Sequence, residues 1–150
     1  MGNTRRVSPA EAKQLLDEGY TYVDVRTEEE FRACHPTGAL NVPMALWSPV
    51  GPRPNGEFVD LIRRLFGEEG KIVLGCATGQ RSLRAAEMLE AAGFRDVIDQ
   101  RAGLDGVRNP FGRLEERGWT AAGLPVSSGI DEGSYDAVKL RPQGAWAARS

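Results

Sequence analysis

A cysteine and an arginine delimit the segment of this chain that is best suited to covalent chemistry. Cys76 follows the apolar run at residues 71–74, and Arg81 stands just before a stretch with helical periodicity. Where a strand, a tight loop and a helix follow one another, the loop amides and the first N–H groups of the helix stabilise an anion. A nearby arginine adds to this effect, so we expect the Cys76 thiol to be largely ionised at neutral pH. A cysteine at the end of a strand is more often inert packing, but Gly79 and Arg81 at these offsets favour a nucleophile.

The residues after Cys76 would form the surroundings of that thiolate. We call residues 76–82 the Cys76 loop; after the cysteine it contains Ala77, Thr78, Gly79, Gln80, Arg81 and Ser82. Gly79 suits a backbone conformation that is closed to most residues, or a close approach to a ligand. Ser82 would fall at the start of the helix, where a hydroxyl can cap the first turn without any part in the chemistry. Gln80 and Arg84 would lie at the mouth of the loop.

This loop resembles the active-site loop of the rhodanese-type sulfurtransferases, which has the pattern Cys-x-x-Gly-x-Arg-Ser. A second segment, residues 24–43, is similar to the N-terminal signature of that family. It contains Asp24 and Arg26 as Asp-x-Arg, followed by Glu-Phe, His, Gly-Ala and Asn-x-Pro. The resemblance extends over residues 7–126 and implies an α/β fold, a rhodanese-like domain with a central, mainly parallel sheet and helices on both faces.

The resemblance implies a sulfurtransferase of the thiosulfate:cyanide class. The Cys76 thiolate would attack the sulfane sulfur of a small donor such as thiosulfate, release sulfite and become a persulfide, which cyanide or a thiol would then accept. Residues 77–82 would stabilise the donor and the persulfide, with Arg81 adding positive charge for an anionic donor. Asp24 and Arg26 would support neighbouring loops by ion pairing and hydrogen bonding. The resemblance implies no cofactor and no metal.

The length of the Cys76 loop separates this chemistry from a related one. Four residues lie between Cys76 and Arg81, whereas cysteine-dependent phosphatases that resemble rhodaneses have a longer stretch there. By family resemblance, the shorter ring of amides suits a persulfide better than a phosphoryl group. Two alternatives stay open: a noncatalytic rhodanese-like binding or regulatory module, although such modules typically lack the cysteine, and an arsenate reductase or phosphatase on the same scaffold.

Three further positions bear on these hypotheses. Cys34 stands where the family usually has Gly, and it could be a bystander thiol, a resolving cysteine or half of a regulatory disulfide. His35, the only histidine of the chain, is expected to order a loop rather than to act as an acid or base. Residues 101–104 replace a Gly-Gly pair with a nearby Trp that is common in the family, which leaves the substrate preference open.

The composition is that of a globular protein. The chain has 150 residues, 41% of them hydrophobic, and a net charge of −2, which gives no reason to expect nucleic acid or a membrane surface as a partner. Residues 1–128 are predicted to form the domain, and residues 129–150 a tail that is flexible or packs on a partner chain. We expect a monomer or a homodimer.

The start of the chain and the cysteine content indicate a compartment. Residues 1–6 contain a basic pair with no apolar segment after it, so we expect no export signal. Two cysteines do not make a disulfide framework, and a reactive thiolate fits reducing conditions. The cytoplasm is therefore the expected location.

Alternating strand and helix patterns would position the Cys76 loop. A capping box at residues 8–11 opens a helix that ends at Gly19, and apolar spacing predicts helices from Phe58 and after the Cys76 loop. Strands are expected at residues 20–25, 39–42, 71–74 and 97–98, and short helices at 27–34 and 111–118. The proline-rich residues 44–56 are predicted to form a surface loop that Trp47 anchors to the core, the alternative being that this ring covers the site.

Overall fold

A parallel β-sheet forms the centre of the protein. Within residues 4–147, which the computed structural model describes, it has five strands in the order β1-β8-β7-β2-β4. They are β1 (Arg5–Val7), β8 (Val97–Gln100), β7 (Ile72–Gly75), β2 (Thr21–Asp24) and β4 (Leu40–Asn41). Each neighbouring pair is parallel, which confirms the predicted sheet, and the carboxyl ends of all its strands therefore meet at one edge.

Helices cover both faces of this sheet, as predicted. They are α1 (Pro9–Asp17), α2 (Glu28–Ala33), α3 (Phe58–Phe66), α4 (Gln80–Ala91) and α5 (Tyr135–Lys139). One core cluster contains the buried residues of α3, α4 and α5 together with Ile72 and Leu74. The other contains those of α1 together with Tyr22 and Val73. Because successive strand residues point to opposite faces, the two clusters lie on opposite sides of the sheet.

Two short helices begin where their sequences predict. Ser8 accepts a hydrogen bond from the Glu11 amide while the Glu11 side chain binds the Ser8 amide, which is the predicted capping box of α1. Thr27 and Glu30 form a second capping box at the start of α2. Each box satisfies amide groups that the first turn of a helix leaves without partners. The beginning of α2 is therefore fixed locally, directly after the end of β2.

The prediction of a helix at residues 111–118 is wrong. This segment instead forms a hairpin in which β10 (Leu114–Glu116) pairs antiparallel with β9 (Val107–Arg108). The side chain of Asn109 accepts hydrogen bonds from the amides of Phe111 and Arg113 and so stabilises a turn. Phe111 is 93% exposed, so a helix there would have had no apolar face to bury.

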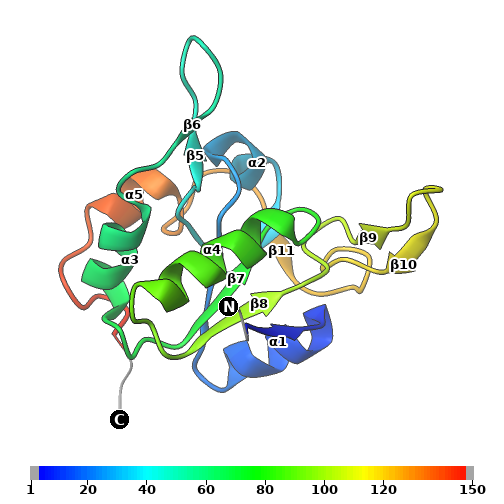
Figure 1. Cartoon of the computed structure of the whole chain (residues 1–150), viewed down its shortest axis with the longest axis horizontal. Coiled ribbons are helices and arrows are strands. Elements are labelled where there is room, and N and C mark those ends of the chain that lie inside the picture. The colour runs from blue at the N-terminus through cyan, green and yellow to red at the C-terminus, as the bar shows by residue number, and fades with distance from the viewer. Residues whose placement is uncertain (1–3, 148–150) are drawn as a thin grey trace.

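The proline-rich segment also contains a hairpin. Residues 44–56 include β5 (Ala45–Leu46) and β6 (Arg53–Pro54), which pair antiparallel, and this hairpin projects from the domain above α2 (Figure 1). Trp47 is 83% exposed, so the prediction that it anchors the segment to the core is wrong. Its ring instead borders a cavity between α2 and the hairpin.

The C-terminal segment packs against the core of its own domain as far as residue 147. Tyr135 and Val138 of α5 belong to the same cluster as α3 and α4, and β11 (Val126–Ser127) pairs with β3 (His35–Pro36). The segment predicted as a tail from residue 129 thus lies on the domain through these contacts; residues 148–150 and 1–3 are outside the described residues. Among the helices of residues 4–147, none is long and apolar enough to cross a membrane.

Candidate active site

Cys76 lies at the carboxyl edge of the sheet, directly after the central strand β7. Cys76 is 2% exposed. Its Sγ accepts hydrogen bonds from the amide of Gly79 at 3.1 Å and from the amide of Ser82 at 3.3 Å. These donors belong to the turn before α4 and to its first turn, where the positive end of the helix dipole adds to their effect. Two amide groups of the Cys76 loop therefore converge on this one sulfur atom.

Gly79 allows this convergence because of its backbone conformation. It is the N-cap of α4 with φ of 95°, in the left-handed region that other residues rarely adopt. A Cβ at this position would also overlap the carbonyl oxygen of Arg101. The glycine predicted as a special position is thus required both by its φ angle and by the close approach of the segment after β8.

The segment after β8, residues 101–106, packs against the Cys76 loop and forms backbone hydrogen bonds with it. The amide of Leu104 donates to the Cys76 carbonyl at 2.8 Å, and the amide of Asp105 donates to the Ala77 carbonyl at 2.9 Å. Gly103 has φ of 66°, and a Cβ there would overlap the Ala77 carbonyl. Where the family commonly has two glycines, the single Gly103 therefore suffices for this close contact. The amide of the neighbouring Ala102 donates a hydrogen bond to the Gln100 side chain.

Ser82 has a different place from the one predicted. It is the third residue of α4 rather than its cap, since Gly79 occupies the N-cap position. Its side chain is fully buried, and its Oγ lies 3.4 Å from the Cys76 Sγ. The prediction that Ser82 caps the helix is therefore wrong: both its amide and its hydroxyl face the sulfur.

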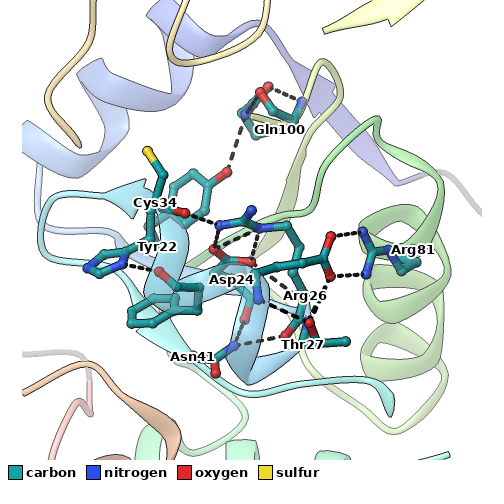
Figure 2. A network of polar contacts seen from close by, with 12 residues as sticks. Tyr22, Asp24, Arg26, Thr27, Cys34, Asn41, Arg81 and Gln100 are labelled. Atoms are coloured by element: carbon teal, nitrogen blue, oxygen red, sulfur yellow. Dashed lines mark hydrogen bonds and ion pairs between the residues drawn. The ribbon is translucent and has the colours of Figure 1, made fainter. Parts of the chain in front are cut away.

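Arg81 is bound to α2 rather than directed at the sulfur. Its guanidinium forms two parallel hydrogen bonds to the Glu30 carboxylate, at 2.8 and 3.0 Å, and Figure 2 shows Arg81 reaching from α4 toward these carboxylate oxygens. Such a bidentate pair is well ordered. The groups that touch Sγ are accordingly backbone amides and the Ser82 hydroxyl, and the Arg81 guanidinium links α4 to α2.

The Arg81–Glu30 pair makes stability depend on pH. Hydrogen bonds from Arg81 are the largest cause that lowers the pKa of Glu30 from 4.5 to about 2. Because the folded-state pKa is depressed, the pair stabilises the fold above about pH 4.5, and this contribution is lost as the pH falls toward 2. Both side chains are about one third exposed, so solvent screening reduces the contribution to about 1–2 kcal/mol.

We expect Glu30→Gln to remove this pH dependence. Urea unfolding at a series of acidic pH values should show that the wild type loses about 1–2 kcal/mol more than the variant between mildly acidic and strongly acidic solution. Glu29→Gln, an exposed neighbour on the same helix, is the matched control and should follow the wild type. Parallel acid profiles for the wild type and Glu30→Gln would contradict the assignment.

Asp24 and Arg26 form a buried pair beside the site, at the end of β2. Arg26 binds the Asp24 carboxylate through Nε and Nη2, the latter at 2.7 Å, and also donates to the Cys34 carbonyl at 2.5 Å. Burial is the largest single influence and acts to lower the pKa of Arg26, but the hydrogen bonds to Asp24 together with the negative charges of Asp24 and Glu30 raise it overall. Asn41 donates to the carbonyls of both residues. These contacts join the ends of β2 and β4 and the end of α2 (Figure 2), which is the supporting geometry that the sequence predicted.

His35 orders a loop, as predicted. Its ring is fully buried and stacks on Phe31 with centroids 3.7 Å apart. One ring nitrogen lies 2.6 Å from the Phe31 carbonyl and the other 2.7 Å from the Asp131 carboxylate. The histidine therefore connects α2 with the C-terminal segment.

Cys34 lies apart from the Cys76 loop. Both cysteines are free thiols, and Cys34 packs against the cluster that contains α1, whereas Cys76 belongs to the cluster on the other face of the sheet. The bystander alternative is the one that this arrangement favours.

The outer side of the Cys76 loop borders a cavity of about 610 Å³. Thr78, Gly79 and Gln80 line it from the loop, and the exposed Gln80 thus lies at the mouth as expected. Arg84, which was expected there too, is exposed but does not line this cavity. Arg6 and Arg101 line it from the strand ends. Sequence reasoning missed Arg6, because its strand β1 has three residues with a single apolar member.

The family of this chain follows from the comparison of its sequence with known proteins. Residues 8–109 match the Rhodanese-like domain, and the chain belongs to this family. It is similar to Thiosulfate sulfurtransferase 18 of Arabidopsis thaliana, with 41% identity over 93 residues that cover 61% of this chain and 68% of the relative. It is also similar to Thiosulfate sulfurtransferase 16, chloroplastic, of the same organism, with 35% identity over 122 residues that cover 81% and 92% of the two chains. In two further relatives, the match covers only 61% and 48% of the length of the relative itself.

A solved structure supports the same fold. The crystal structure of Rv0390 from M. tuberculosis superposes with a TM-score of 0.70 at 26% sequence identity, and the match covers 85% of this chain and 100% of that one. The predicted fold class, a rhodanese-like α/β domain with a central parallel sheet, is thus confirmed.

Proposed function

We propose that this protein is a sulfurtransferase that carries a sulfane sulfur on Cys76. The observation that supports this most is the geometry around Sγ: the amides of Gly79 and Ser82 donate to it at 3.1 and 3.3 Å. Donors fixed by the backbone stabilise a sulfur anion without reorganisation during the reaction. The relatives named thiosulfate sulfurtransferase are consistent with this activity.

The proposed reaction has two displacement steps. In the first, the Cys76 thiolate attacks the sulfane sulfur of thiosulfate; a bond forms between Sγ and that sulfur, the sulfur–sulfur bond of the donor breaks, and its electron pair leaves with sulfite. In the second, cyanide or a thiolate attacks the terminal sulfur of the persulfide, and the electron pair of the broken bond returns to Sγ. The amides of the Cys76 loop would stabilise both sulfur anions.

The Arg81–Glu30 pair refines the expected role of Arg81. With both guanidinium nitrogens bound to Glu30, Arg81 would act mainly by fixing the position of the first turn of α4. The size of the donor then counts for more than its charge, since Cys76 is only 2% exposed. We propose small sulfur compounds as donors and a thiol or cyanide as acceptor, and a reducing compartment such as the cytoplasm for a protein with two free thiols.

A single-turnover experiment tests the proposal. The purified protein is incubated with thiosulfate alone, and sulfite and intact mass are measured. We expect about one sulfite per protein chain and a mass increase of one sulfur atom that peptide mapping assigns to Cys76. Cyanide should then remove this added sulfur as thiocyanate and restore the original mass. If neither thiosulfate nor a low-molecular-weight persulfide adds sulfur to Cys76, the proposal is wrong; hydrolysis of an aryl phosphate by the same protein would favour a phosphatase instead.

A further inference from the structure

An ion pair beneath the Cys76 loop comes from the two outermost strands on one side of the sheet. Arg6 of β1 is the register partner of Asp99 of β8, and the Arg6 Nε lies 2.7 Å from the Asp99 carboxylate. The Asp99 side chain is fully buried, whereas that of Arg6 is 38% exposed. Asp99 therefore depends on Arg6 for the partner that a buried carboxylate needs.

The same guanidinium also binds the Cys76 loop. The Nη2 of Arg6 donates to the Gly79 carbonyl at 3.1 Å, and the amide of Gly79 in turn donates to the Cys76 Sγ. A glycine has no side chain to restrict its backbone, so its orientation depends on what its carbonyl and amide contact. Arg6 thus fixes one side of the residue whose other side touches the sulfur.

The surroundings of Asp99 keep the pair in place. Its Oδ2 accepts from Arg6, while its Oδ1 is buried and accepts no hydrogen bond from the residues that the structure describes. Burial is the larger cause that raises the pKa of Asp99, and the neighbouring Ser82 hydroxyl and the Arg6 guanidinium act in the opposite direction. Rotation of Arg6 away from Asp99 would leave this carboxyl without a charged partner, which strongly favours the observed rotamer.

We propose that Arg6 and Asp99 are positioning residues that set the reactivity of Cys76 through the Gly79 peptide. Asp99 orients the guanidinium, the guanidinium holds the Gly79 carbonyl, and the Gly79 amide is thereby directed at Sγ. Neither residue is bonded to the sulfur: the contacts of Arg6 are to Asp99 and to the Gly79 carbonyl. The inference rests on the proposed function only for its consequence in sulfur transfer, because the reactivity of the thiol can be measured without it.

Alkylation of Cys76 by iodoacetamide tests this inference directly. The Cys34→Ser background leaves Cys76 as the reacting thiol, and the second-order rate is measured from acidic to alkaline pH. Arg6→Met alone would leave Asp99 unpaired, so the informative variant is Arg6→Met with Asp99→Asn, which removes the pair as a unit. Arg5→Met, an exposed neighbour on the same strand, is the matched control.

The double variant and the Arg5→Met control should differ clearly in the rate at which Cys76 is alkylated. We expect the double variant to react about tenfold more slowly at neutral pH, with its rate profile displaced toward higher pH, while Arg5→Met stays within about twofold of the background. Arg6→Lys keeps the charge but cannot bind Asp99 and Gly79 with two separate nitrogens, and it should resemble the double variant. Circular dichroism and thermal unfolding establish that each variant is folded.

Two results would overturn the inference. One is a folded double variant with the rate and pH profile of the background. The other is full reactivity of Cys76 in Arg6→Lys, which would show that a positive charge near the loop is sufficient. If the double variant does not fold, the alkylation rate of Arg6→Lys alone tests the inference. A slow double variant, in a protein whose Cys76 takes up sulfur from neither thiosulfate nor a low-molecular-weight persulfide, would leave the inference standing and reject the proposed function, so the two failures are distinguishable.

Discussion

Replacement of Cys76 by Ser should reduce thiocyanate formation from thiosulfate and cyanide by at least about a thousandfold. Serine preserves the shape of the side chain and can still accept from the amides of Gly79 and Ser82, but its oxygen cannot form the persulfide on which the proposed reaction depends. The loss should lie in kcat. Thiocyanate is measured colorimetrically under saturating donor.

Cys34→Ser is the matched control for this experiment. Cys34 packs in a different core cluster from Cys76, so its replacement should leave the rate within about twofold of the wild type. Equal activity of the wild type and Cys76→Ser would reject Cys76 as the sulfur carrier. A large loss in Cys34→Ser together with retained stability would instead revive the resolving-cysteine alternative.

Gly79→Ala should be the most damaging conservative change in the Cys76 loop. The backbone at this position has φ of 95°, which costs an L residue about 1–2 kcal/mol, and the added Cβ would overlap the Arg101 carbonyl, which adds about 1–3 kcal/mol. Relief of this overlap moves the Gly79 amide away from Sγ. We expect about 2–5 kcal/mol of destabilisation and about a hundredfold slower sulfur transfer.

Gly129→Ala separates the two causes of this effect. Gly129 has φ of 85°, and a Cβ there would meet nothing within 4 Å, so this variant has the backbone strain without the overlap. It should lose about 1–2 kcal/mol in urea unfolding and retain its activity. If Gly79→Ala were as stable and as active as Gly129→Ala, close packing behind the Cys76 loop would not matter for function.

Local patterns predicted the surroundings of Cys76 well. The strand before it and the helix after it are read from consecutive residues, and the capping box at Ser8 likewise needs only four neighbours in sequence. The same holds for Gly79, whose exceptional conformation follows from the turn between β7 and α4. Features that a short stretch of backbone determines could therefore be predicted from the sequence.

Side-chain partners that are distant in sequence could not be predicted in this way. Arg81 is paired with Glu30, 51 residues away, and Arg6 with Asp99, 93 residues away. Charges on the surface of a helix or a short strand are usually solvated. Only the register of β1 with β8 brings Arg6 to Asp99, and only the tertiary fold brings the start of α4 within reach of Glu30. The role expected of Arg81 changed for this reason.

Two mispredicted segments have another physical cause. Residues 111–118 are charged enough for a solvated helix, but the side chain of Asn109 closes a turn before such a helix can start. Trp47 is large and apolar, which usually means burial, yet the hairpin that carries it projects away from the core. In both cases a local turn decided the outcome, and residue type alone was misleading.

The contact between His35 and Asp131 has a consequence for how this domain can vary in evolution. The histidine lies inside the region that matches the family, residues 8–109, whereas its carboxylate partner lies outside it. A substitution of either residue would leave the other buried or half-buried without its partner, so the two positions should change together among relatives. The unit that folds is accordingly longer than the stretch that matches the family.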